Sequence, residues 1–113
     1  MPRTLTRNHE HFQRALKRMP LGVASNFRFW GEDRTIYVKS GRGARITDLD
    51  DNVYVDYRMG YGPAILGYAD ARVDEAARQG MEVGGVFALS TECEYRVAEL
   101  CSSPIPKQDL LPW

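Results

Sequence analysis

The fold is decided by the stretch GARITDLDDNVYVDY, residues 43–57. Within it, residues 50–52 form a tight-turn signature, because Asp and Asn tolerate the left-handed backbone that such turns require. After this turn, residues 53–57 alternate with a period of two, which is typical of a half-buried strand. Before it, residues 45–49 can form the strand that pairs with them. The stretch therefore predicts an antiparallel hairpin.

A further strand is predicted upstream of the hairpin. From Thr35 onward the pattern again has a period of two, with Ile36 and Val38 on one side. Gly41-Arg42-Gly43 then supplies a turn signal. The three segments together predict a three-stranded antiparallel meander.

An amphipathic helix is predicted before the meander, over Arg7–Met19. Its apolar positions recur at helical spacing: Phe12, Ala15, Leu16 and Met19. Pro20 is expected to end it. The segment from Leu21 to Arg34 is an irregular connection rich in aromatic residues, and we expect it to pack against another part of the molecule.

Two helices are predicted after the meander. Asp70 is the expected N-cap of the first, which runs through Gln79 and is broken by glycines from Gly80 onward. Thr91 and Glu94 predict a capping box for the second. The expected class is α+β, with an N-terminal helix, a three-stranded antiparallel meander and then two helices.

Composition and charge exclude several classes of function. Of 113 residues, 43% are hydrophobic and 27% charged, and 15 basic residues balance 15 acidic ones. A net charge of zero gives no field that attracts nucleic acid or an anionic membrane, and no apolar run is long enough to span a bilayer. Cys93 and Cys101, without a secretory signal, predict reduced thiols in the cytoplasm, packed as small core residues.

Two candidate metal motifs are incomplete. His9 and His11 lie two residues apart on a helix and therefore point about 160° away from each other. Asp48, Asp50 and Asn52 match the start of a calcium loop, but the glycine and the final glutamate of such a loop are missing. We expect no metal site and a plain hairpin turn.

Arg28 is the strongest candidate binding residue that the residues themselves offer. Residues 25–30, Ser-Asn-Phe-Arg-Phe-Trp, surround one guanidinium with hydroxyl, amide and aromatic groups. Because a guanidinium binds carboxylates bidentately, Arg28 could clamp an amino or keto acid. The alternative is a surface arginine in a loop that packs on a neighbour, and composition alone favours that alternative.

Four stretches, in this order, carry a resemblance to a known family: PLGVASNFR (20–28), GARITDLDDNVYVDY (43–57), GPAILG (62–67) and FALSTECE (87–94). They resemble the N-terminal motifs of the class III, fold-type I aminotransferases that use pyridoxal 5′-phosphate (PLP). The likeness is greatest to the branch of glutamate-1-semialdehyde 2,1-aminomutase. Two positions depart from the family pattern: Asp51 replaces the usual hairpin glycine, and Gly67–Ala71 replaces Gly-His-x-His-Pro.

The resemblance implies a function for three residues. Ser25 and Arg28 would contact the carboxylate of an amino- or keto-acid substrate, and Tyr61 would lie near the substrate and the cofactor. PLP is the cofactor of the full-length family, whose members are cytoplasmic transaminases or aminomutases acting on amino acids or amino-aldehydes. Family members are dimers, and their N-terminal segments pack on the rest of the subunit and on the partner.

The sequence then departs from the family after its last predicted helix. The family continues into a Ser-Gly-Thr-Glu-Ala-type loop for the PLP phosphate and later provides the Schiff-base lysine, and neither is found here. The only lysines, Lys17, Lys39 and Lys107, are predicted on a solvated helix face, in a strand and in a tail. We therefore expect no catalytic residue and no PLP binding by this chain alone.

Residues 1–103 are accordingly interpreted as the N-terminal segment of a class III aminotransferase, a truncated portion of the PLP-transferase fold. Residues 104–113 are interpreted as a divergent proline-rich tail, which can be neither helix nor central strand. We expect the chain to be inactive alone. The alternative is a non-catalytic interaction module that docks onto a full-length aminotransferase subunit, and a homodimer also fits the resemblance.

Overall fold

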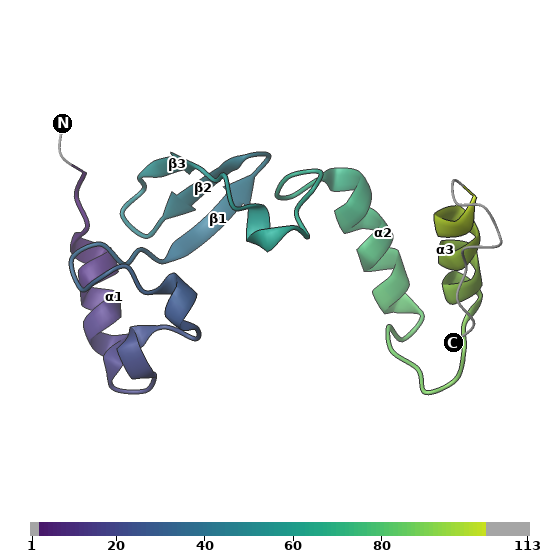
Figure 1. Cartoon of the computed structure of the whole chain (residues 1–113), viewed down its shortest axis with the longest axis horizontal. Coiled ribbons are helices and arrows are strands. Elements are labelled where there is room, and N and C mark those ends of the chain that lie inside the picture. The colour runs from purple at the N-terminus through teal and green to yellow at the C-terminus, as the bar shows by residue number, and fades with distance from the viewer. Residues whose placement is uncertain (1–2, 104–113) are drawn as a thin grey trace. The chain divides into compact units, whose positions relative to one another are not determined.

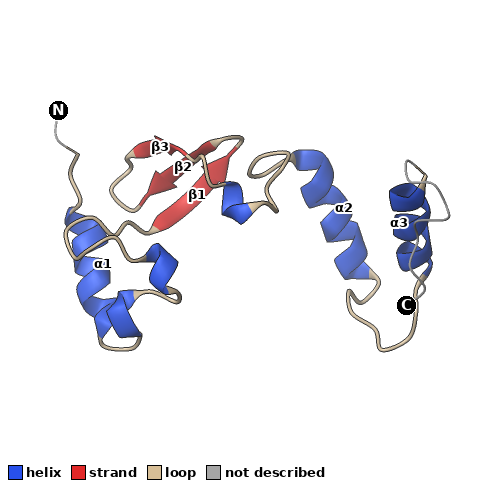
Figure 2. Ribbon diagram, viewed as in Figure 1, coloured by secondary structure: helices blue, strands red, loops and turns tan. Residues whose placement is uncertain are grey.

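The computed structural model describes residues 3–103 and has the expected α+β composition (Figure 1; Figure 2). Its helices and strands are α1 (Thr6–Leu16), β1 (Val38–Arg42), β2 (Arg45–Asp48), β3 (Val53–Val55), α2 (Ala71–Glu82) and α3 (Glu92–Ser102). Three short 3₁₀ turns are η1 (Pro20–Gly22), η2 (Asn26–Arg28) and η3 (Met59–Tyr61). The chain divides into two compact units, Met1–Asp74 and Glu75–Trp113. The predicted tail, 104–113, lies outside the described residues.

The predicted meander is confirmed, with strand order β1-β2-β3 and antiparallel pairing throughout. The first strand begins later than expected, at Val38, and it continues through residues predicted to turn. The reason is the register: Arg42 pairs with Arg45, which leaves Gly43 and Ala44 as a two-residue hairpin loop. Gly43 has the positive φ, 55°, that such a loop requires.

The core of the first unit lies where α1 meets the segment that follows it. Phe12 and Ala15 of α1 are buried, and the Phe12 ring stacks on that of Phe29 with centroids 6.3 Å apart. The helix ends at Leu16, earlier than predicted. Met19 has an extended backbone (φ −133°, ψ 133°), which is the conformation that a following proline imposes.

The N-terminus of α2 agrees with the sequence, but its C-terminus does not. Asp70 is the N-cap, since its Oδ1 accepts a hydrogen bond from the backbone N–H of Arg72 at 3.0 Å. Gly80 does not break the helix, which runs to Glu82. A glycine inside a helix lowers helix stability by only about 1 kcal/mol relative to alanine. The hydrogen bonds of the neighbouring helical turns outweigh this loss.

Two expectations for α3 are wrong in this structure. Thr91 stands at the N-cap, but its side chain makes no capping hydrogen bond with the described residues, so the capping box does not form. Cys93 and Cys101 are exposed rather than packed in a core. Their exposure is general to the described part of the second unit, because no side chain is buried in residues 75–103. Within residues 3–103, no helix combines the length and the apolarity needed to cross a membrane.

Candidate functional site

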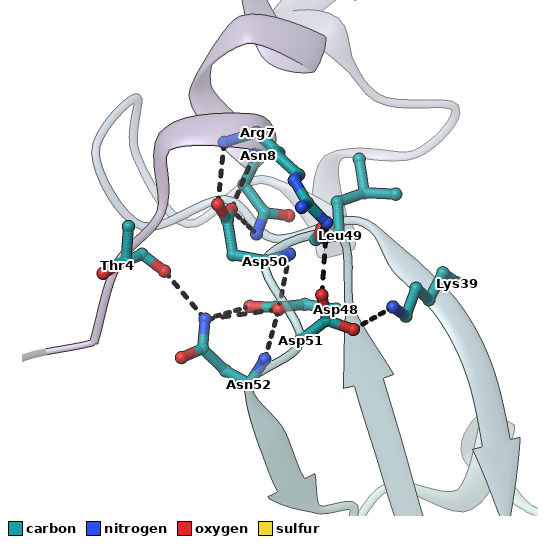
Figure 3. Close-up of polar contacts among 9 residues, drawn as sticks. All are labelled: Thr4, Arg7, Asn8, Lys39, Asp48, Leu49, Asp50, Asp51 and Asn52. Atoms are coloured by element: carbon teal, nitrogen blue, oxygen red, sulfur yellow. Dashed lines mark hydrogen bonds and ion pairs between the residues drawn. The ribbon is translucent and has the colours of Figure 1, made fainter.

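A buried carboxylate organises the turn between β2 and β3 (Figure 3). Asp48 is inaccessible to solvent. Its Oδ1 accepts hydrogen bonds at 2.9 Å from the N–H groups of Asp50 and Asn52, and its Oδ2 accepts one at 2.9 Å from the Tyr54 hydroxyl. Burial alone would raise the pKa of Asp48, but the hydrogen bonds from Asn52 and Tyr54 outweigh it and leave that pKa below its ordinary value. Burial of the Tyr54 side chain, followed by its hydrogen bond to the Asp48 carboxylate, raises the pKa of Tyr54 to about 12.

The next carboxylate in the turn, that of Asp50, caps α1 from a distance in sequence. It accepts hydrogen bonds from the N–H groups of Arg7 (2.8 Å) and Asn8 (2.9 Å), in the first turn of the helix. Asn8 is buried, and its Oδ1 accepts the N–H of Tyr37 at 2.6 Å. The acidic residues of this turn therefore bind protein donors. No group of metal-ligating side chains occurs among the described residues.

The aromatic segment after α1 is fixed at both ends. Near its start, the Tyr37 hydroxyl donates to the Gly22 carbonyl at 2.7 Å. Near its end, the buried Thr35 hydroxyl accepts the N–H of Trp30 at 3.1 Å and donates to the Gly31 carbonyl at 2.8 Å. The intervening residues, which include Ser25 and Arg28 at η2, are therefore held at both ends by Thr35 and Tyr37, which precede β1.

Ser25 and Arg28 lie at the two ends of η2. The N–H of Arg28 donates to the Ser25 carbonyl at 2.9 Å, which closes a 3₁₀ turn between the two residues. Ser25 is half-buried and Arg28 is exposed. The structure thus brings the two predicted binding residues to one turn of backbone.

Tyr61, the third predicted residue, lies on η3 and reaches the same segment. Its ring meets that of Phe27 edge to face, with centroids 6.2 Å apart and an interplanar angle of 60°. Phe27 is the residue between Asn26 and Arg28 on η2. Tyr61 is 65% exposed, so most of its ring faces solvent beside η2.

The turn that carries Tyr61 is positioned by Asp56, a residue that the sequence analysis did not single out. Asp56 Oδ1 accepts the N–H groups of Arg58 (2.7 Å) and Met59 (3.2 Å), and its Oδ2 accepts the hydroxyl of Tyr68 at 2.5 Å. The Tyr68 hydroxyl is the main reason that the pKa of Asp56 lies below its ordinary value. These bonds connect the start of η3 to Tyr68, which stands where the family motif has its first histidine.

Tyr68 is itself anchored on the hairpin loop. Its backbone exchanges two hydrogen bonds with Gly43, of 2.8 and 2.9 Å. The preceding residue, Gly67, has a φ of 90°, and a Cβ there would lie 2.9 Å from the Gly43 Cα. The close approach of these two backbones holds the segment after η3 on the sheet, and it requires glycine at position 67.

Arg58 is the site residue that sequence reasoning missed. One Nη atom hydrogen-bonds to the Tyr61 hydroxyl and lies 3.5 Å from the Phe27 carbonyl oxygen. The guanidinium carbon lies 4.6 Å from the centroid of the Trp30 ring and 5.4 Å from that of Tyr61. Arg58 thus bridges the Tyr61 turn and the aromatic segment. In the sequence, only its position three residues before Tyr61 points weakly to this contact.

The described lysines do not fit the role of a Schiff-base residue. Such a lysine works as a neutral amine inside a pocket. Lys17 is exposed immediately after α1, and Lys39 of β1 forms an ion pair with Asp51 at the hairpin turn (Figure 3). Lys107 lies outside the described residues. The described residues therefore do not fit PLP as a covalently bound group, and no chemical step can be assigned through it.

Comparisons with known proteins agree on one kind of enzyme, although no protein-family model matches the chain. The chain is 43% identical over 91 residues to the glutamate-1-semialdehyde 2,1-aminomutase of Thermoplasma volcanium, covering 80% of this chain and 21% of that protein. It is 38% identical over 110 residues to the enzyme of that name from Acetivibrio thermocellus, covering 96% and 26% respectively.

Solved structures give the same picture. A transaminase with PLP bound matches with a TM-score of 0.79 at 29% identity, covering 89% of this chain and 24% of that one. A glutamate-1-semialdehyde aminomutase from Pseudomonas aeruginosa PAO1, in complex with PMP, matches with a TM-score of 0.77 at 26% identity, covering 86% and 22%. The chain therefore spans about a fifth to a quarter of the length of the relatives it matches.

Proposed function

This chain is an aminotransferase-like segment homologous to glutamate-1-semialdehyde 2,1-aminomutases, and we propose that it forms the wall of a PLP-dependent active site that holds the substrate carboxylate. Ser25 and Arg28 bind the carboxylate, and Tyr61 covers it. The substrate is an amino acid or an amino-aldehyde carboxylate, and the parent reaction is a transamination or an aminomutase reaction of the cytoplasm. We assign no catalytic residue within residues 3–103 and expect no turnover by this chain alone.

One observation carries the proposal. Residues from two segments that are distant in the sequence lie together at η2, where the Tyr61 ring packs on Phe27 beside Arg28. Arg28 is exposed, and together with the Ser25 hydroxyl on the same backbone turn it offers the groups that a carboxylate needs, namely a bidentate fork and a further hydrogen-bond donor. The rigid anchors at Gly22 and Thr35 keep this arrangement in place.

Carboxylate binding can be tested with butyrate as the probe. Saturation-transfer NMR on butyrate, with the full 113-residue chain, is expected to give a measurable affinity that R28Q weakens about tenfold, which corresponds to the loss of about 1.4 kcal/mol of binding free energy. S25A should weaken it less, because only one neutral hydrogen bond is lost. R42Q, which changes an exposed arginine on β1, is the matched control. Equal affinities for R28Q and R42Q would refute the proposal.

The absence of catalysis by this chain alone can be tested with the cofactor. The chain is incubated with PLP, reduced with borohydride and digested, and the peptides are examined by mass spectrometry. We expect no stoichiometric label at one lysine, because Lys39 is paired with Asp51 and Lys17 is exposed. A single lysine labelled in full would refute this part of the proposal.

A second candidate function is supported by the apolar surface. The buried hydrophobic side chains of residues 3–103 are only Phe12, Ala15 and Val23, whereas large apolar side chains such as Ile65 (88% exposed) and Leu100 (73% exposed) face solvent. Surfaces of this kind are typical of sites that another protein covers. The chain would then dock, without catalysing a reaction, onto a full-length aminotransferase subunit, or pair with a second copy as a homodimer.

Co-expression distinguishes these assemblies. The chain and a full-length aminomutase relative are produced together and separated by size-exclusion chromatography. A mixed species is the expected result of docking, and a species of twice the chain's mass, found when the chain is produced alone, indicates the homodimer. Elution of both proteins as separate species, with the chain as a monomer, would count against both assemblies.

A further inference from the structure

We infer that Arg58 is a second anion-binding residue of the same site, so that the site is built for a substrate with two carboxylates. This inference rests on the proposed function, because it takes Arg28 as the first carboxylate-binding residue. It adds a substrate class, the dicarboxylates, which includes acidic amino and keto acids.

The Arg58 guanidinium is fixed by aromatic groups and not by a carboxylate. It lies 4.6 Å from the Trp30 ring centroid and 5.4 Å from that of Tyr61. Within residues 3–103, no carboxylate oxygen lies within ion-pair distance of it. The charge is therefore held in position by rings, and no described carboxylate neutralises it, so it remains able to bind an incoming anion.

The nearest acidic residue in the sequence is already occupied. Asp56 Oδ1 accepts the backbone N–H groups of Arg58 and Met59, and its Oδ2 accepts the hydroxyl of Tyr68. The Asp56 carboxylate thus fixes the main chain of Arg58 without meeting its guanidinium within the described contacts. Neutralisation of Arg58 is left to another group.

The donors of Arg58 also leave room for a bidentate ligand. A guanidinium has five N–H donors, and only one Nη takes part in the described hydrogen bonds, to Tyr61 and to the Phe27 carbonyl. The Nε–H and the second Nη of arginine form the edge that fits the two oxygens of a carboxylate. This edge belongs to a side chain that touches the carbonyl of Phe27, the residue bonded directly to Arg28. Arg58 thus contacts the backbone of the segment that carries Arg28.

The test compares two acids of similar length, glutarate with two carboxylates and butyrate with one. Arginine-labelled full-length chain is titrated with each acid, and dissociation constants are taken from the shifts of the arginine Nε–Hε signals. We expect glutarate to bind about tenfold more tightly than butyrate. R58Q should reduce this ratio to about one, while R28Q should weaken both acids. R42Q should behave as the unmodified chain.

The conservative variant R58K guards against a merely structural effect. It keeps the charge and loses the planar fork, so the ratio should fall at least threefold while the signals of Arg28 stay at their positions in the unmodified chain. A ratio near one in the unmodified chain, or a ratio that R58K and R58Q leave unchanged, would overturn the inference. Butyrate affinity that R28Q leaves unchanged would instead refute the proposed function, whatever the ratio shows for Arg58.

Discussion

The side-chain amide of Asn8 donates a hydrogen bond of 2.7 Å to the carboxylate of Asp50, across 42 residues of sequence. The same carboxylate accepts the backbone N–H of Asn8, and the amide oxygen of Asn8 accepts the N–H of Tyr37. One buried side chain therefore joins α1, the approach to β1 and the hairpin turn. Figure 3 shows its contact with Asp50. This junction holds the helix and the sheet together, and the segment that carries η2 runs between them.

Replacing Asn8 should destabilise the first unit. N8A removes the side-chain hydrogen bonds of Asn8 to Asp50 and Tyr37. The Tyr37 N–H is then left without an acceptor, which should lower the free energy of unfolding by roughly 2 kcal/mol. Urea unfolding followed by circular dichroism measures this cost. The control is H9A, on the exposed face of the same helix, which should change stability by less than about 0.5 kcal/mol. Equal unfolding midpoints for the two variants would contradict the assigned role of Asn8.

Stability should fall in acid, partly through Asp48. Its folded-state pKa is below the ordinary value of 3.8, so its contribution is fully present above that pH and is lost as the pH falls through the folded pKa. D48N should therefore flatten the pH dependence below about pH 4, and at neutral pH it should cost roughly 2 kcal/mol because an amide donor then faces other donors. Denaturation at several pH values checks both effects. Parallel curves for D48N and the unmodified chain would be inconsistent with this role.

The two glycines at positions 67 and 80 should respond to alanine in opposite directions. G67A places a Cβ 2.9 Å from the Gly43 Cα at a φ of 90°, which should cost about 1–3 kcal/mol. G80A meets nothing within 4 Å inside α2 and should stabilise the helix by about 0.5–1 kcal/mol. Thermal unfolding of both variants measures the difference. A G67A variant as stable as G80A would show that the two backbones do not approach closely.

Removing the Tyr68 hydroxyl should change the titration of Asp56. Because this hydroxyl is the main cause of the lowered pKa of Asp56, Y68F should raise that pKa toward its ordinary value. Carbon-13 NMR of the Asp56 carboxyl group follows the change directly. Y57F alters a tyrosine that is almost wholly exposed and should leave the pKa in place. A pKa of Asp56 that is the same in both variants would remove Tyr68 from the positioning of η3.

Short-range patterns in the sequence predicted the elements, and long-range contacts decided their limits. The alternation after residue 53 and the Asp-Asp-Asn turn predicted the meander, and Asp51 has the expected positive φ of 67°. The shift of β1 depends on its pairing with β2, which a period of two cannot specify. The exposure of Cys93 could not be predicted either, because an apolar helix face indicates burial without indicating whether this chain supplies the cover.

The candidate site was predictable only in part for the same reason. Ser25 and Arg28 share one local turn, so a single motif pointed to both. The contact of Tyr61 with Phe27 depends on the Gly43–Tyr68 pairing and on the bond from Tyr68 to Asp56, and local sequence does not specify these partners. Arg58 was missed because its partners are rings and a backbone carbonyl from another segment. Residues that act through such distant partners are visible only in the fold.

The decisive measurement for the carboxylate role of Arg28 is its own side-chain NMR signal. Arginine-labelled full-length chain is titrated with butyrate, and the Nε–Hε signal of Arg28 is assigned from its absence in R28Q. We predict a saturable shift of the Arg28 signal, with the signal of Arg42 unmoved at the same concentrations. Equal small drifts of both signals up to the highest concentration would mean that η2 holds no carboxylate, and the proposed function would then be wrong.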